Sequence, residues 1–157
     1  MKTTTLATLT LLLAFLGIAD AWYLTESAYT GTPLTCDISG LDGCNTVAQS
    51  SYSHLLGYPL ALYGVFFFSL LFVLAAVALF APRRTVYFAL KILGIIGLVA
   101  SLIFICIQLF LIKAVCVYCF GSAFISLFIF LCTRFMWRRE RNSSSVPAPL
   151  GQASVLP

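Results

Sequence analysis

The sequence predicts an all-α integral membrane protein: a four-transmembrane-helix bundle with a long extracytoplasmic loop between helices 1 and 2. Three observations predict this class. Of the 157 residues, 61% are apolar and 9% are charged, against about 45–50% and about 25% in soluble domains. Nine Lys or Arg and five Asp or Glu residues are too few to cover the surface of a soluble core. Finally, the chain contains four uncharged stretches with the length of membrane-spanning helices.

These stretches contain 17, 24, 21 and 20 residues and begin at positions 3, 58, 92 and 114. Each is close to the roughly 20 residues that cross about 30 Å of hydrocarbon at about 1.5 Å per residue. They are apolar on every side rather than alternating, which argues against a small barrel. One membrane domain is therefore predicted over 1–141, with an outer loop at 24–57 and helices at about 5–23, 58–81, 86–111 and 115–137.

The signs of the charges predict the orientation of the bundle. No Lys or Arg lies between Lys2 and Arg83, whereas four acidic residues fall within that interval. Most other basic residues follow the second or the fourth span. Because cytoplasmic segments carry the excess of Lys and Arg, both termini are predicted in the cytoplasm and the loop at 24–57 outside. We expect a multi-pass protein of the inner (plasma) membrane, with a disordered Ser-rich and Pro-rich cytoplasmic tail at 142–157.

The first span has a second interpretation, as a secretory signal peptide. Lys2 precedes an apolar run, and the pattern Ala19-Asp20-Ala21 is typical of a cleavage site. Cleavage would leave three helices in the bundle instead of four. The loop that follows lies outside under either interpretation.

Four of the six cysteines are predicted to meet on the outer face. Cys36 and Cys44 lie in the outer loop, whereas Cys116 and Cys119 form a C-V-Y-C motif where the fourth helix begins. Disulfides form and persist in the oxidising compartment outside the membrane. The other two cysteines lie within apolar helices and are expected to be small packing residues; they are Cys106 and Cys132.

A C-x-x-C motif at a helix N-terminus is suited to redox chemistry. Unpaired backbone N–H groups and the helix dipole stabilise a thiolate, which is the form that exchanges with disulfides. A second cysteine pair on the same face favours an electron relay. Two alternatives stay open: a static disulfide staple in the loop, and half of a zinc site. The oxidising compartment disfavours zinc, so no metal is predicted.

Such a relay needs an acceptor for two electrons, since dithiol oxidation releases a pair. The sequence contains no nucleotide, haem or flavin motif. A lipid-soluble quinone takes two electrons and two protons and resides in the bilayer. We therefore expect ubiquinone or menaquinone to approach Cys119 laterally between the helices.

With these features the chain resembles the vitamin K epoxide reductase family, over about residues 6–137. Three stretches carry the resemblance. They are the C-x7-C segment from Cys36 to Cys44 with Ser50 six residues later, the segment LGYPLALYG at 56–64, which is similar to the family's G-x-P-x-x-L-x-G, and the C-V-Y-C motif at 116–119.

The resemblance implies a role for each of these cysteines. Cys119 would react with the quinone, and Cys116 would be its disulfide partner and take electrons from Cys44. Cys36 would meet the external redox partner, a separate thioredoxin-like (DsbA-like) extracytoplasmic protein. Ser50 would lie near the quinone head group.

The chain departs from the family at two positions. Animal members place an Asn and a Tyr near the quinone carbonyls, where this chain has Leu60 and Ala123. Leu60 and Ala123 are predicted to line an apolar substrate pocket, to which Tyr63 or Ser122 could add a hydroxyl. Quinone reduction is therefore expected rather than epoxide reduction.

The sequence thus predicts a quinone-dependent thiol oxidoreductase that supports disulfide bond formation. The alternative from another class is a non-enzymatic membrane scaffold with a disulfide-stapled outer loop. A DsbB-type oxidase also has four helices and two outer cysteine pairs, but its C-x-x-C lies in the first outer loop, the reverse of the order seen here.

Overall fold

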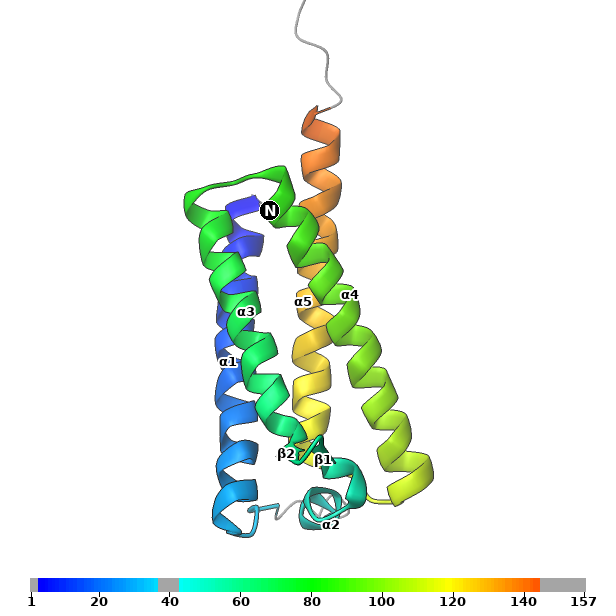
Figure 1. Ribbon diagram of the computed structural model, residues 1–157. Helices are drawn as coiled ribbons and strands as arrows, with labels where there is room; N and C mark the ends of the chain where they lie inside the picture. The colour runs from blue at the N-terminus through cyan, green and yellow to red at the C-terminus, as the bar shows by residue number, and fades with distance from the viewer. Residues whose placement is uncertain (1–2, 37–42, 145–157) are drawn as a thin grey trace, which may run out of the picture.

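Four long helices form the protein, and all run along the same direction as the long axis of the bundle (Figure 1). The computed structural model describes residues 3–36 and 43–144. Each long helix is apolar and long enough to span a bilayer, which confirms the predicted multi-pass class. The helices are α1 (Thr3–Thr30), α3 (Leu60–Phe80), α4 (Arg84–Cys106) and α5 (Val117–Ser144).

A proline separates α3 from α4. Pro82 has no backbone N–H and restricts the residue before it, so a helix cannot continue through this position. The N–H of Ala81 makes the last bond of α3, to the Val77 carbonyl at 2.7 Å. α4 begins two residues after the proline, which gives a tight turn carrying Arg83.

Close packing in the bundle depends on small residues. The buried face of α1 includes Ala14, Gly17 and Ala21, at spacings of three and four residues. A Cβ on Gly94 of α4 would lie 2.6 Å from Thr133 Oγ1 and 3.3 Å from the Phe130 Cα of α5. Because lipid provides no hydrophobic driving force for association between helices, van der Waals contacts at such close approaches stabilise the bundle.

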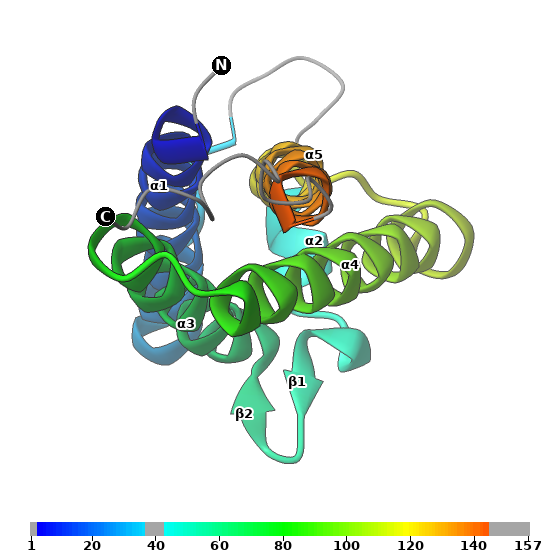
Figure 2. The same cartoon turned by 90° about the horizontal axis from the view of Figure 1, so that it is seen from above.

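The four helices do not pack equally. α1 contacts α3 and α5 extensively and α4 contacts α5, whereas α3 and α4 share few contacts although they are consecutive. Figures 1 and 2 show α3 and α4 diverging from the turn at Arg83 toward the opposite end. The divergence leaves room between α3 and α4 at that opposite end.

The predicted outer loop at 24–57 is wrong at its start, because α1 continues seven residues beyond its predicted end, to Thr30. The rest of the connection is partly structured. It contains α2 (Cys44–Ala48), a 3-10 turn (Ser51–Ser53), and the antiparallel strands β1 (His54–Leu55) and β2 (Tyr58–Pro59). Polar side-chain clamps and short-range turns order this segment, and hydropathy alone does not reveal them.

The hairpin between β1 and β2 has a two-residue loop. Both loop residues, Leu56 and Gly57, have positive φ, at 53° and 86°. Positive φ at both positions is the requirement of a type I′ turn, which matches the twist of paired strands. The hairpin leads directly into α3.

The other helix ends also differ from the predicted bounds. α4 continues from Cys106 as a π-helical turn, Ile107–Ile112, which ends at Lys113 in the left-handed conformation (φ 56°). α5 runs to Ser144 rather than 137, so residues 142–144 are helical and not part of a disordered tail. The remainder of the predicted tail lies outside the described residues.

The two ends of the bundle have different characters. The turn at Arg83, the start of α1 and the end of α5 lie together, whereas α2 and the hairpin lie at the opposite end (Figure 1). The segments predicted to be cytoplasmic therefore share one end. The segments that carry the C-x7-C and C-x-x-C pairs meet at the other.

Packing at Gly94 gives the first prediction. We expect Gly94→Ala to lower the free energy of unfolding by about 1–3 kcal/mol, because its Cβ would overlap Thr133 and the α5 backbone. Gly121→Ala is the matched control, since a Cβ there would meet nothing within 4 Å. Thermal unfolding in detergent measures both. Equal stability of the two variants would contradict the close α4–α5 contact.

Candidate active site

Cys36 and Cys44 form a disulfide at the hairpin end of the bundle, with their Cα atoms 6.4 Å apart. Cys44 is the first residue of α2 and is fully buried. The adjacent Asn45 holds the chain before Cys36: its Oδ1 accepts the Leu34 N–H at 2.8 Å, and its Nδ2 donates to the Leu34 carbonyl at 3.2 Å. Cys44 belongs to α2, and the segment that precedes Cys36 is hydrogen-bonded to Asn45 of α2. Both cysteines of the disulfide are therefore held at this helix.

Gly43 brings this disulfide against the link between α4 and α5. A Cβ on Gly43 would lie 2.7 Å from the Val115 N and 2.9 Å from the Ala114 Cβ. The backbone of Gly43 has a φ of −75°, which any residue can adopt. Glycine is therefore required here for its small size and not for its backbone conformation. As a result, Cys44 and Cys116 share one small buried cluster with Leu34.

Cys116 occupies the position just before α5. Its carbonyl accepts the first helical N–H, from Phe120 at 3.2 Å, and its side chain is 1% exposed. The Cys119 side chain, hydrogen-bonded to Cys116, lowers the pKa of Cys116 to about 7, and the backbone N–H groups of Cys119 and Tyr118 act in the same direction. Burial and the Asp20 carboxylate oppose this shift. The C-x-x-C motif thus stabilises a thiolate at its first cysteine.

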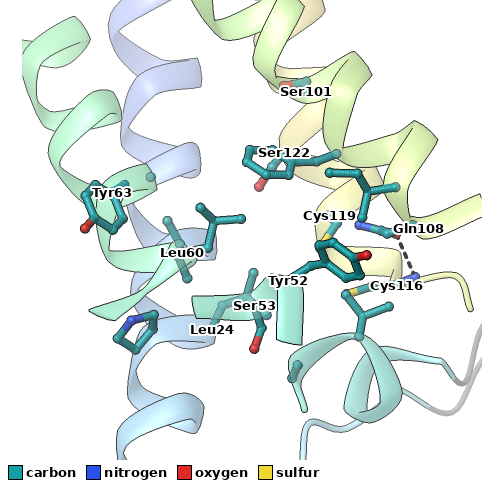
Figure 3. Close-up of a pocket in the computed structure, with 18 of the residues that line it drawn as sticks. Leu24, Tyr52, Ser53, Leu60, Tyr63, Ser101, Gln108, Cys116, Cys119 and Ser122 are labelled. Atoms are coloured by element: carbon teal, nitrogen blue, oxygen red, sulfur yellow. Dashed lines mark hydrogen bonds between the residues drawn. The ribbon is translucent and has the colours of Figure 1, made fainter. Parts of the chain in front are cut away.

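Gln108 fixes the segment before Cys116 from within the π-helical turn. Its side chain is 3% exposed, and its Oε1 accepts the Cys116 N–H at 3.3 Å (Figure 3). This bond leaves the amide nitrogen on the side of Cys119 and the cavity. π-Helical turns within α-helices are frequent at functional sites, where they redirect a side chain.

A cavity of about 440 Å³ lies beside the two thiols, between α3 and α4. Residues of all four long helices and of the α2–hairpin segment line it. In Figure 3, Leu60 of α3 lies on one side and Cys119 and Gln108 on the other. Its walls are mainly apolar and aromatic, with a few polar groups near the thiols; among these walls are Phe67, Phe68, Tyr52, Ser122 and Gln108.

This cavity suits a quinone head group. A planar, apolar ring with two carbonyl acceptors needs apolar walls and a small number of donors, the usual composition of a ligand pocket of this size. The amide of Gln108, the hydroxyl of Ser122 and the thiol of Cys119 all face it. The residues present therefore fit the cofactor that the sequence predicts.

Besides cysteines, four residues singled out in the sequence line this cavity, namely Ser50, Leu60, Tyr63 and Ser122. The Ser50 hydroxyl donates to the Val47 carbonyl at 2.7 Å, and the Tyr63 hydroxyl to the Leu55 carbonyl at 3.0 Å. Both hydroxyls therefore support the α2–hairpin segment as well as the cavity wall.

Ala123 does not line the cavity beside the thiols, contrary to its predicted place near the same substrate. It faces a second cavity of about 170 Å³ between α4 and α5, with Leu98, Phe120 and Leu127 among the walls. The physical reason is the helical repeat: Cys119, Ser122 and Ser126 of α5 share one face, and position 123 turns about 100° away from Ser122.

One acidic residue of the bundle escaped the site prediction. Asp20 of α1 accepts a hydrogen bond from the Ser122 hydroxyl of α5. In the sequence, Asp20 served only as a topological marker and as part of the candidate cleavage pattern. The signal that could have identified it is an acidic residue within a largely apolar helix, three residues after the buried Gly17.

Fold and site together define a polytopic membrane protein with a thiol–disulfide centre beside an apolar cavity. A sequence model of the Vitamin K epoxide reductase family matches residues 8–134, so the chain belongs to this family. Members of the family are oxidoreductases, and they generally use quinones. A search among curated proteins finds no match to the chain.

The lowered pKa of Cys116 gives the second prediction. We expect its alkylation by a small thiol reagent to rise with pH to half its maximum at about pH 7, because only the thiolate reacts. Cys119→Ala removes the hydrogen bond that lowers this pKa, so the midpoint should move upward. Mass spectrometry of the modified peptide measures the profile. A midpoint at about 8.5, the ordinary value, would contradict stabilisation of the thiolate.

Proposed function

We propose that the protein is a quinone-dependent thiol oxidoreductase that supports disulfide bond formation. Electrons would pass from an extracytoplasmic thioredoxin-like protein through Cys36/Cys44 to Cys116/Cys119 and on to quinone. One observation carries the proposal: Cys44 and Cys116 share a buried cluster, and the C-x-x-C pair borders an apolar cavity.

The relay consists of successive disulfide exchanges. The reduced partner first reduces the Cys36–Cys44 disulfide, becoming oxidised itself. The Cys44 thiolate then attacks Cys116 of the Cys116–Cys119 disulfide, and Cys119 leaves as a thiolate. Cys36 next attacks Cys44, which restores the loop disulfide and releases Cys116. A low pKa makes Cys116 a good leaving group in this last exchange.

In the structure Cys36 and Cys44 are joined, whereas Cys116 and Cys119 are not. In the proposed cycle, this pairing would come after an electron pair has passed from the loop to the C-x-x-C pair. The remaining step would form the Cys116–Cys119 disulfide and release two electrons and two protons, for which a quinone, when bound, would be the acceptor.

Residues that line the cavity would take part in this last step. Cys119 would be the thiol that faces the quinone, with Gln108 fixing Cys116 behind it. Ser50 and Leu60 would contribute to the substrate-binding wall. Mainly apolar surroundings exclude water, which strengthens each polar contact made there.

We also propose the location and orientation of the protein. The predicted inner (plasma) membrane placement, with both termini in the cytoplasm, follows from the basic residues at the Arg83 turn and the end of α5. The cysteine end then lies outside, where a DsbA-like partner would reach Cys36. Residues 1–141 would act as one membrane domain.

Quinone reduction by the purified protein tests this function and is the third prediction. With a reduced thioredoxin-like donor, alanine at any of the four relay cysteines should abolish activity. With a small dithiol donor, Cys36→Ala and Cys44→Ala should retain activity, because the donor can reduce the C-x-x-C pair directly. Cys106→Ala is the control, since this thiol lies outside both pairs.

Two results would contradict the proposal. Quinone reduction by Cys119→Ala at the wild-type rate would exclude the terminal role of this thiol. Cysteines locked in one oxidation state whatever the quinone supply would instead favour the alternative, a membrane scaffold with a disulfide-stapled loop.

A further inference from the structure

Asp20 is an acidic side chain well inside a membrane-spanning helix. It precedes the end of α1 by ten residues, or about 15 Å of helix at about 1.5 Å per residue. Within the described parts of the chain no Lys, Arg or His forms an ion pair with it. Ionisable residues within membrane-spanning helices are costly and are generally retained for function.

The partner of Asp20 connects it to the active-site cavity. Ser122 of α5 donates its hydroxyl proton to Asp20 Oδ2 and also lines the cavity. Ser122 follows Cys119 by three residues, so both side chains lie on one face of α5 (Figure 3). Asp20 also lies near enough to interact electrostatically with the thiols of Cys116 and Cys119.

We propose that Asp20 and Ser122 form a proton relay from the thiol pair to the quinone; this inference rests on the proposed quinone reductase function. Asp20 would be a positioning and proton-storing residue that acts through Ser122. The Ser122 hydroxyl would be the group that touches the quinone oxygen.

The relay balances protons over each turnover. When Asp20 is protonated, its O–H donates to Ser122 Oγ, and the Ser122 proton is free to pass to the oxygen in the cavity. Asp20 becomes a carboxylate and accepts the bond from Ser122, as in the structure. It then takes up a proton released when Cys116 and Cys119 form their disulfide. Each pass of the relay carries one proton, so it would run twice for each Cys116–Cys119 disulfide formed. The two sulfurs lose two electrons and two protons, and the quinone would gain both.

A purely structural role is the competing explanation, because an interhelical hydrogen bond between α1 and α5 would also stabilise the bundle. Asp20→Asn separates the two roles. Its amide oxygen still accepts the Ser122 hydroxyl, but the side chain cannot carry the proton. Asp20→Glu restores a carboxyl group, and Ser122→Thr retains the hydroxyl.

The fourth prediction concerns quinone reduction with a small dithiol as donor. Asp20→Asn should lower kcat by about 10²-fold, the usual size of a general acid–base contribution, with unchanged KM and thermal stability. Ser122→Ala should lower kcat by a similar factor. Asp20→Glu and Ser122→Thr should recover much of this loss. Thr25→Val, at a buried α1 residue bonded to its own helix, should retain the wild-type rate.

A second readout needs neither quinone nor turnover. Infrared difference spectra between the thiol and disulfide forms should contain a carboxyl signal that Asp20→Asn removes. Absence of that signal, or a wild-type kcat in Asp20→Asn, would overturn the relay. Loss of thermal stability with unchanged kcat would assign the pair a structural role and also overturn it.

Failure of the relay is distinguishable from failure of the proposed function. If only the relay is wrong, Cys119→Ala abolishes quinone reduction while Asp20→Asn leaves it intact. If the function itself is wrong, the wild-type protein does not reduce quinone with any dithiol donor, and the relay falls with it.

Discussion

The close approach of Gly43 to the α4–α5 link is the contact on which the site depends. A side chain at this position would overlap the Val115 backbone, so only glycine lets α2 dock there. Docking buries Cys44 with Cys116 and places Cys44, Val47 and Ala48 on the wall of the cavity. The Asn45 clamp and the bond from the Tyr118 hydroxyl to the Thr35 carbonyl, at 2.9 Å, hold the same junction. The described part of the connection between α1 and α3 is thereby held against the helices of the bundle.

Much of the fold could be predicted because the membrane imposes strong constraints on the sequence. Helix lengths follow from bilayer thickness, and their number from the uncharged stretches. The ends of the helices were harder to predict, since hydropathy does not specify where the backbone hydrogen bonds of a helix stop. α1 continues through the polar residues up to Thr30, and the π-helical turn at Ile107–Ile112 is as apolar as the α-helix before it. Both features depend on local hydrogen bonds that periodicity cannot reveal.

The cysteine pairs could be recognised from spacing and topology, but their surroundings could not. The sequence identifies C-x-x-C at a helix start, and the structure adds the bonds that stabilise its thiolate. Ala123 was grouped with Leu60 by resemblance, yet α5 turns it toward a different cavity. Asp20 was missed because its partner lies 102 residues away, on another helix. Contacts of this range follow only from the packed bundle.

Trapping a disulfide between the two cysteine pairs most directly tests the central claim, which is that electrons pass from one pair to the other. In a Cys36→Ser, Cys119→Ser double variant, Cys44 and Cys116 lose their usual partners while their buried contact is retained. Non-reducing peptide mass spectrometry of protein oxidised in membranes should then find Cys44 linked to Cys116 as the main disulfide. Recovery of both as free thiols, or of Cys44 linked only to other proteins, would contradict electron transfer between the pairs.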